Sequence, residues 1–585
     1  MSHLARGLNT IHVVGIGPED AIALTEAFPN VLFFPDTSSL STDVPSLCVD
    51  IRTNETLIGP LTLPNRAGCW RCAFERISAA LATSESSHLL SRNEISKKIT
   101  PVLIREIQAI NTDRLEQSSL VDHVLVIDLS TLDESLHKVV PLARCNVCGG
   151  AAAFPAIVNE PLHLSPENAP EIVLEALAGW VDRRTGIISD LFIEPPDDPR
   201  VSLPIIATAA PPHVMEKDGS LRRLPIGWGK GLTISGAVLS AVGEAIERYS
   251  ASVVDPNRIV WKHPDELEGE FLDPRDCGLY SDAQYQRADF PYVRFDPNIA
   301  HPWVLGNWLN NGKPVWVSAI FVFLSIELLQ EQVIAQGTSN GLAASTDKDD
   351  AALRAVLELV ERDAFMTTWL TAYPTQRLQL DDTLDPLLRT VLEGIEALGG
   401  TIEVYQLPAS VVGTTVLCLA LGDGDQYPGV TFGLGCDLDP RAALRQAVLE
   451  LGQTGPYLRR MMRSKVLTAA ENPAGVRAML DHAAYYFPKE RATAFDRLRS
   501  ENSTVNLRDL NAVEKRSLKD CAAALDEAGV RMALVDVTSA DVATGPFRVM
   551  RAISPDLQPI WYGYGLDRIN KLKIASDVPP INPIW

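Results

Sequence analysis

The 585-residue chain lacks several features that mark common functional classes. It has no uninterrupted apolar run of about 18 residues, so no transmembrane helix is predicted. Its opening residues, MSHLARGLNT, lack the apolar stretch of a signal peptide. Basic residues are outnumbered, with 52 Lys and Arg against 74 Asp and Glu, a net charge of −22. This charge argues against nonspecific binding to nucleic acid or anionic membranes, and it is compatible with a cationic peptide or a basic partner protein.

Familiar nucleotide and catalytic motifs are missing as well. No G-x-x-x-x-G-K-[ST] loop occurs, and the spacing around Lys230 is wrong for one. Gly15 and Gly17 begin a dinucleotide fingerprint, but Asp20 stands where the third glycine is needed, so a structural turn is favoured. We find no Ser/His/Asp or Cys/His arrangement, no repeat of roughly 20–50 residues and no low-complexity tract.

What is present is typical of a globular protein. Hydrophobic residues make up 46% and charged residues 22% of the chain, and its length predicts roughly two to four structural units. The nine cysteines, an odd number, indicate a reducing compartment, so a cytoplasmic location is expected.

Two units are predicted from the order of strand-like and helix-like segments. Residues 1–165 alternate short strands and helices, with strands of a mostly parallel sheet expected at 10–17, 31–34, 46–51 and 123–129. A Pro/Gly/Ala-rich seam at 148–170 and a helix at 171–186 precede the second unit, 173–585. That unit is predicted to be α+β, with helices at about 233–252, 347–370 and 440–456 and strands at 303–308, 314–323, 402–407 and 415–422.

Four of the cysteines form two C-x-x-C pairs, Cys69 with Cys72 and Cys145 with Cys148. Two such knuckles commonly build a tetrahedral Cys₄ zinc site, so we expect structural zinc that ties two distant segments together. Unrelated free thiols, or a redox role for one pair, are the alternatives.

The motif E-x-x-E-R occurs twice. In the first helix Ser240, Glu244, Glu247 and Arg248 fall within an arc of about 100°, and the rest of that helix is apolar or small. A helix that is apolar on nearly all sides is buried, and buried carboxylates need cations, donors or a cavity.

The second helix repeats this arrangement. An arc of about 80° contains most of its charges, with Arg362 at the edge: Asp347, Asp350, Arg354, Glu358 and Glu361. The preceding Gly/Ser/Asn segment, 337–345, is suited to offering backbone amides to an anion. Each Glu–Arg pair alone is typical of a solvated helix surface. Two such helices facing each other would concentrate carboxylates that Mg²⁺ neutralises, which predicts an Mg²⁺–nucleotide site.

These segments resemble a known family. SAVGEAIER (240–248) is similar to the S-x-x-x-E-x-x-E-R signature of the YcaO superfamily. The stretches at 337–345 with 357–365 and at 433–453 resemble its further motifs, and the resemblance covers about 173–585. It implies ATP and Mg²⁺ bound without a P-loop. Asp350 stands where the family has a glutamate. The implied ligands of nucleotide and metal are Ser240, Glu244, Glu247, Arg248, Asp350, Glu358, Glu361 and Arg362.

The N-terminal unit resembles the truncated ThiF-like, Rossmann-related domain of azole-forming cyclodehydratases, which binds structural zinc through four such cysteines and has often lost its nucleotide site. The fusion implies an ATP-dependent cyclodehydratase that acts on Cys, Ser or Thr of a ribosomally made precursor peptide. Catalysis would rest on Glu244, Glu247, Glu358 and Glu361, and on Trp585 at the end of VPPINPIW (578–585), a segment similar to the Pro-x-Pro-x-Pro ending of azoline-forming members.

The resemblance also implies partners. The first strand begins within about ten residues of Met1, so we expect a separate leader-peptide-binding protein, together with a possible dehydrogenase and a possible homodimer. Backbone thioamide or amidine formation at the same ATP site is the nearest alternative, and a catalytically silent zinc-containing scaffold is another.

Overall fold

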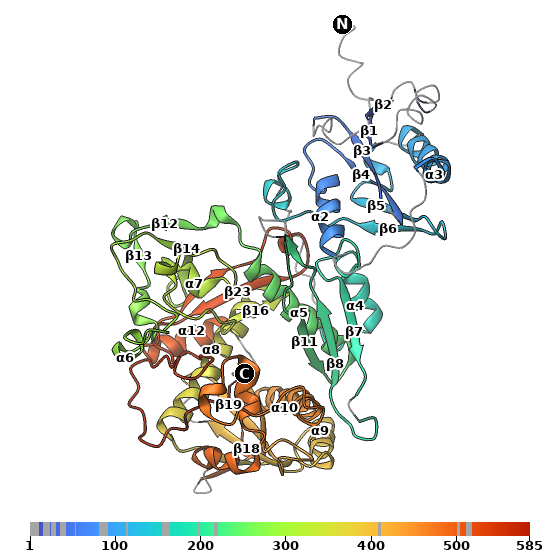
Figure 1. The fold of residues 1–585 in the computed structure, drawn as a ribbon. Coiled ribbons are helices and arrows are strands. Elements are labelled where there is room, and N and C mark those ends of the chain that lie inside the picture. Colours follow the sequence, from blue (N-terminus) through green and yellow to red (C-terminus); the bar gives the residue numbers. More distant parts are fainter. Residues whose placement is uncertain are drawn as a thin grey trace.

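The computed structural model describes residues 11–15, 24, 28, 31–34, 43–52, 54–80, 92–112, 115–154, 164–196, 198–215, 220–407, 411–499, 503–510 and 517–584. Figure 1 shows a small N-terminal unit, in blue, beside a larger one that holds the remaining sheets. The mixed α/β class predicted from the sequence is confirmed. None of the helices within these ranges is long and apolar enough to cross a membrane.

The N-terminal unit is built on one six-stranded sheet. Its order is β2 (Val31–Phe34), β1 (Ile11–Val14), β3 (Ser46–Ile51), β4 (Glu55–Thr62), β5 (His123–Asp128) and β6 (Glu134–Lys138). The four strands β3 to β6 pair antiparallel, so the prediction of a mostly parallel sheet is wrong beyond β1 to β3. The links from β3 to β4 and from β5 to β6 are too short for the crossover that parallel strands require.

Helices α2 (Trp70–Ala80) and α3 (Arg92–Thr112) belong to two different hydrophobic clusters of this sheet. Ile107 of α3 packs with Leu47 and Ile58, while Ile77 of α2 packs with Leu57 and Val124. The alternation of side chains along each strand explains why neighbouring residues such as Leu57 and Ile58 belong to different clusters.

The larger unit contains three main sheets. Two segments in it differ from the prediction. The helix expected over 171–186 ends early, as α4 (Pro170–Ala176), because Gly179 adopts a φ of +79° and Val181 then forms isolated bridges. The strand expected over 314–323 is β15 (Pro314–Ser318) followed by the short helix α7 (Ala319–Val322). The three-stranded sheet has the order β11 (Gly227–Gly231), β8 (Ile205–Ala210) and β7 (Asp190–Glu194).

The other sheets have seven and five strands. The seven-stranded sheet runs β13 (Glu270–Phe271), β15, β14 (His301–Trp308), β22 (Ala533–Asp536), β23 (Arg548–Ile553) and β16 (Leu342–Ser345), with β12 (Val260–Lys262) on β14. The five-stranded sheet runs β20 (Val430–Asp437), β19 (Thr414–Leu421), β18 (Thr401–Leu407), β17 (Gln376–Gln379) and β21 (Thr504–Asn506). A small pair joins β9 (Val214–Met215) and β10 (Leu221–Arg222), and shorter helices are α6 (Asp282–Tyr285), α9 (Pro386–Ala397), α11 (Met479–Tyr485) and α12 (Leu518–Glu527).

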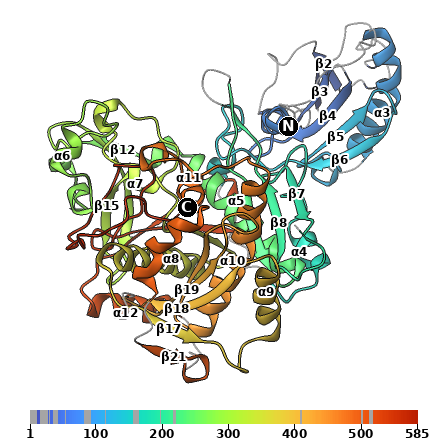
Figure 2. The same ribbon diagram turned by 60° about the horizontal axis from the view of Figure 1, so that its bottom comes forward.

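Three long helices separate these sheets, and the sequence predicted all three. Helix α5 (Ile234–Ser252) contacts the three-stranded sheet and also β16, whereas α8 (Lys348–Thr371) contacts β16 and β23 as well as the five-stranded sheet. Helix α10 (Pro440–Arg463) crosses β19 and β20 (Figure 2) and runs past the predicted end near 456. Side chains cap all three helices, since Thr233, Asp347 and Asp439 each accept a hydrogen bond from a first-turn amide.

Glycines let β11 approach α5 closely. A Cβ on Gly227 would lie 2.1 Å from the carbonyl oxygen of Ala241, and one on Gly229 would lie 2.1 Å from that of Ala237. Strand β20 meets α10 in the same way, through Gly433. The two strands carry the Gly-x-Gly spacing that such a close approach requires on alternate residues.

A buried ion pair joins the two units. The guanidinium of Arg76, on α2, donates to the carboxylate of Asp541 at 2.7 Å and to the hydroxyl of Tyr249 on α5 at 2.9 Å. Arg76 also donates to the carbonyl oxygens of Val140 and Pro141. Arg76 and Asp541 are almost fully buried, so this contact fixes the unit that carries the cysteines against helix α5.

Candidate active site

A cavity of about 1640 Å³ lies where α5, α8 and α10 converge. Each helix turns the same part of its surface toward the cavity. Positions are counted here from the N-cap residues, which are Thr233 for α5, Asp347 for α8 and Asp439 for α10. The residues seven, eleven, fourteen and fifteen positions after the cap line it in all three cases. They are Ser240, Glu244, Glu247 and Arg248 on α5, Arg354, Glu358, Glu361 and Arg362 on α8, and Gln446, Glu450, Gln453 and Thr454 on α10.

The structure therefore brings the two E-x-x-E-R motifs together on one cavity, where Glu358 of α8 raises the pKa of Glu247 of α5. Strand β16 contacts both helices. The amide of Ala344, in this strand, donates to Glu247 of α5 at 2.8 Å, and the amide of Gly341, just before it, donates to Glu358 of α8 at 3.3 Å. The segment predicted to offer amides to an anion thus offers two of them to these carboxylates.

Glu244 is held in a similar way. It accepts a hydrogen bond from the amide of Trp228 at 2.9 Å and another from the guanidinium of Arg248 at 3.1 Å. A carboxylate with one oxygen fixed by a backbone donor keeps acceptor capacity on its other oxygen. Backbone amides therefore orient Glu244, Glu247 and Glu358 and leave all three able to bind a cation in the cavity.

Burial sets the electrostatics of the cluster. Loss of water raises the pKa of Glu247 to about 8, with Glu244 and Glu358 adding to the rise and Arg248 opposing it. Burial also raises the pKa values of Glu358 and Glu361. Such carboxylates gain stability from a proton or a cation, and hard divalent ions such as Mg²⁺ take carboxylate oxygens. The donor set therefore fits Mg²⁺, and Arg248 and Arg362 beside it fit the charge of a phosphate.

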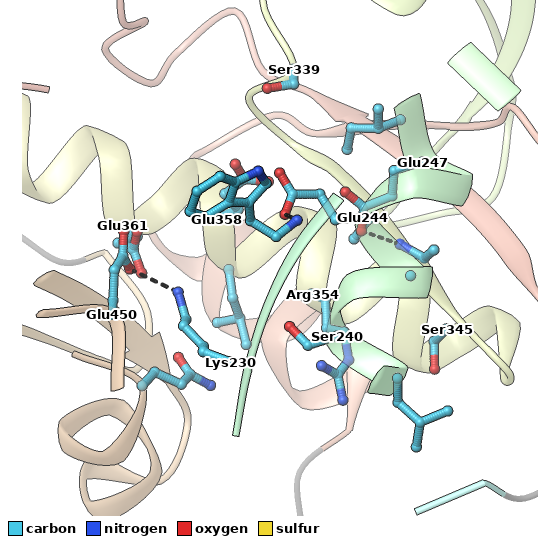
Figure 3. Close-up of a pocket in the computed structure, with 18 of the residues that line it drawn as sticks. Lys230, Ser240, Glu244, Glu247, Ser339, Ser345, Arg354, Glu358, Glu361 and Glu450 are labelled. Carbon is cyan, nitrogen blue, oxygen red and sulfur yellow. Dashed lines mark hydrogen bonds and ion pairs between the residues drawn. The ribbon is translucent and has the colours of Figure 1, made fainter. Parts of the chain in front are cut away.

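Sequence reasoning missed the contribution of α10 and β11 to this cavity. Lys230 on β11 lies 3.7 Å from the carboxylate of Glu450 (Figure 3), and Gln453 donates to the carbonyl oxygen of Trp228 at 3.1 Å. The indole of Trp228 packs edge-on against Tyr457, with 4.9 Å between ring centroids. The signal that could have found Glu450 is its distance from the helix cap, which is the same as that of Glu244 and Glu358.

Residues 228–558, more than half of the chain, match the family described as YcaO cyclodehydratase, ATP- and Mg²⁺-binding. The chain belongs to the YcaO family. Its fold resembles that of a heterocyclase solved in complex with substrate and cofactor, with a TM-score of 0.71, 19% identity, and coverage of 96% of this chain and 83% of that one. The heterocyclase TruD gives a TM-score of 0.64 at 18% identity, over 96% of this chain and 82% of that one.

A sequence relative is known as well. An uncharacterized protein of Methanothermobacter thermautotrophicus is 26% identical to the YcaO chain over 257 residues, which are 44% of this chain and 62% of that relative. This chain therefore spans less than two thirds of the length of the curated relative.

Two predicted site residues of this YcaO protein remain, Asp350 and Trp585. Asp350, in the first turn of α8, accepts from the hydroxyl of Ser345 and from the guanidinium of Arg354, both at 2.7 Å. It lines the cavity together with these partners and with the glutamates of both motifs. Trp585 lies outside the described residues.

The four cysteines of the YcaO protein converge in the N-terminal unit. Their sulfur atoms all lie within 4.8 Å of one another, the one such group of potential metal ligands in the described part of the chain. The Sγ atoms of Cys69 and Cys145 are 3.6 Å apart and those of Cys72 and Cys148 are 3.8 Å apart. Tetrahedral zinc with Zn–S bonds of about 2.3 Å requires sulfur atoms about 3.8 Å apart, so the cluster fits zinc.

Proposed function

We propose that this YcaO protein uses ATP and Mg²⁺ to cyclodehydrate Cys, Ser or Thr residues of a ribosomally made precursor peptide, giving thiazolines or oxazolines. The observation that carries the proposal is one cavity that receives the carboxylates and arginines of both E-x-x-E-R helices. Membership of the YcaO family and the fold shared with heterocyclases support it.

The residues divide into two groups in this proposal. Glu244, Glu247, Glu358 and Glu361 hold Mg²⁺, with Asp350 as a further ligand through Oδ1, since Ser345 and Arg354 both donate to its Oδ2. Ser240, Arg248 and Arg362 bind the nucleotide. ATP supplies the phosphoryl group that turns the amide oxygen into a leaving group, and the protein contributes positioning and charge neutralisation.

The chemistry balances without a nucleophile from the enzyme. The sulfur or oxygen of the substrate side chain loses its proton and bonds to the carbon of the preceding amide carbonyl. The carbonyl oxygen takes the γ-phosphoryl group of ATP, which releases ADP. Phosphate then leaves with that oxygen while the amide nitrogen loses its proton and forms the C=N bond, so the peptide loses one water, about 18 mass units.

A second use of the same site is activation of a backbone amide for thioamide or amidine formation, and a non-catalytic zinc-containing scaffold is a third possibility. A thioamide adds about 16 mass units to the peptide, whereas an azoline or an amidine closed within the peptide removes about 18. Fragmentation then separates the last two products by the residue at which the mass changes.

The two units of the chain have different roles in this proposal. The four cysteines bind structural zinc in a ThiF-like unit over 1–165, and residues 173–585 form the ATP-dependent unit. Trp585, in the Pro-rich segment, takes part in the active site. The precursor peptide is presented by a separate leader-binding protein, a dehydrogenase acts on the product, and the protein works in the cytoplasm as a homodimer. The nine cysteines, all within the described residues, form no disulfide.

Replacing the central glutamates tests the active site. We expect Glu247→Gln and Glu361→Gln each to lower peptide-dependent ATP consumption and loss of water by about 100-fold or more, because each removes a charge from the cation site. Glu393→Gln, at an exposed position on α9, is the matched control and should leave both rates unchanged. Unaltered rates in both cavity variants would show that this pocket is not the active site.

A further inference from the structure

The cavity is larger than a nucleotide alone requires. Pockets for small ligands are typically about 300–1,000 Å³, and this one measures about 1640 Å³. Besides the charged cluster it has a part lined by aromatic and aliphatic side chains, namely Tyr457, Met479, Leu480, Ile560 and Tyr562. Tyr562 is one of these side chains, and the charged groups of the cluster act on its hydroxyl.

Tyr562 has an unusually well-fixed backbone for a residue outside helices and strands. The side-chain amide of Gln336 accepts from its N–H at 2.8 Å and donates to its carbonyl oxygen at 3.2 Å. The next residue, Gly563, donates its N–H to Nε2 of the buried His482 at 2.8 Å. Nδ1 of the same ring donates to the carbonyl oxygen of Asn582 at 2.7 Å. Side chains from distant parts of the sequence therefore hold this turn in one position.

The ring of Tyr562 is held as well. It packs edge-on against His482, with 5.8 Å between ring centroids, and its side chain lines the cavity. Arg362, Arg248 and Glu358 are the charged groups that act on its hydroxyl. Burial raises the pKa of this hydroxyl above its usual value, so it carries its proton at neutral pH. Among the described residues we find no hydrogen-bond acceptor for that proton.

We propose that the hydroxyl of Tyr562 donates a hydrogen bond to the carbonyl oxygen of the reacting peptide bond, and that the apolar part of the cavity holds the adjoining peptide. This inference rests on the proposed function. As the side chain of the substrate attacks, negative charge develops on that oxygen, next to the arginines that would hold the phosphates. A donor already fixed at that point stabilises the charge without reorganisation when the reaction occurs. Tyr562 is then a catalytic residue that contacts the peptide rather than the nucleotide.

The test uses a defined probe and two tyrosine variants. The probe is a pool of N-acetylated pentapeptides with a central Gly-Cys pair and varied flanking residues, incubated with the full-length protein, Mg²⁺ and ATP. Mass spectrometry measures the rate of water loss, and calorimetry measures the Kd of Mg²⁺–ATP. Tyr562→Phe removes only the hydroxyl. Tyr405→Phe is the matched control, because the hydroxyl of Tyr405 donates to Glu403 inside β18.

We expect Tyr562→Phe to slow water loss tenfold or more while the Kd of Mg²⁺–ATP and the melting temperature stay close to wild type. Tyr405→Phe should keep the wild-type rate. The inference is overturned if Tyr562→Phe dehydrates the pool within about twofold of wild type, or if it weakens Mg²⁺–ATP binding as much as it slows the reaction. Absence of water loss from every peptide of the pool with the wild-type protein would also overturn this inference, because the cavity would then not accept a short peptide by itself. The proposed function is tested separately, by Glu247→Gln and Glu361→Gln acting on the precursor peptide.

Discussion

Each of three cavity glutamates has one oxygen fixed by a backbone amide. The amides belong to Trp228, Gly341 and Ala344, which lie before the N-termini of α5 and α8 in the chain. Helical periodicity placed the glutamates on the correct helix faces, but it could not show these amides, because the contacts depend on how strands pack against helices. The contacts of Asp350 with Ser345 and Arg354 are local in sequence, and they depend on the side-chain rotamers at the start of α8.

At the scale of single residues, the raised pKa of Glu247 makes cation binding depend on pH. Since this pKa is about 8, a proton competes with Mg²⁺ for the site at lower pH. We expect the Kd of Mg²⁺, measured by calorimetry with a non-hydrolysable ATP analogue, to rise about 25-fold as the pH falls from 8.5 to 6.5, with protons released on binding. Glu247→Gln should flatten this dependence, and a Kd that does not change with pH in the wild type would contradict it.

At the scale of elements, the three long helices α5, α8 and α10 were predictable from the sequence, but their equivalence was not. Helix α10 shares with α5 and α8 the distance of its cavity residues from the cap, but it lacks the E-x-x-E-R motif. Errors arose where short segments decide the structure. Gly179 ends the helix expected over 171–186, and β4 and β6 went unrecognised, which hid the antiparallel half of the first sheet.

The contact between β11 and α5 predicts opposite effects for two glycines. Gly229→Ala would place a Cβ 2.1 Å from the carbonyl oxygen of Ala237, so we expect it to separate strand from helix, at a cost of about 2–4 kcal/mol. Gly243→Ala, within α5, meets no atom within 4 Å and should stabilise the helix by about 0.5–1 kcal/mol. Thermal unfolding of both variants checks the pair, and an unchanged melting temperature for Gly229→Ala would contradict the close packing.

At the scale of the whole molecule, the sequence predicted two regions and a cysteine cluster that spans the first. It could not show the arrangement of α5, β16 and α8, because that depends on how three sheets stack around the helices (Figure 1). The assignment of zinc to the cysteines stays a prediction, although the distances between the sulfur atoms suit it.

Loss of the cysteine cluster should act on folding rather than on turnover. If the cluster holds zinc as proposed, the metal would join α2 to the segment that follows β6, so we expect Cys69→Ser and Cys145→Ser to lose zinc and most of the soluble protein. Metal analysis and recovery of soluble protein are the measurements. Cys521→Ala, at a buried cysteine of α12, is the control and should stay soluble with zinc bound. Well-folded, metal-free Cys69→Ser with low activity would point to a catalytic role instead.

The contact of Arg76 with Asp541 has a consequence for how the chain is made. The two residues are separated by 465 positions, and both are almost fully buried once paired. During synthesis the cysteine-bearing unit leaves the ribosome long before Asp541 exists, so only the carbonyl oxygens of Val140 and Pro141 are available to Arg76 at that stage. The ion pair that fixes this unit against α5 can therefore form only after the latest part of the chain has been made.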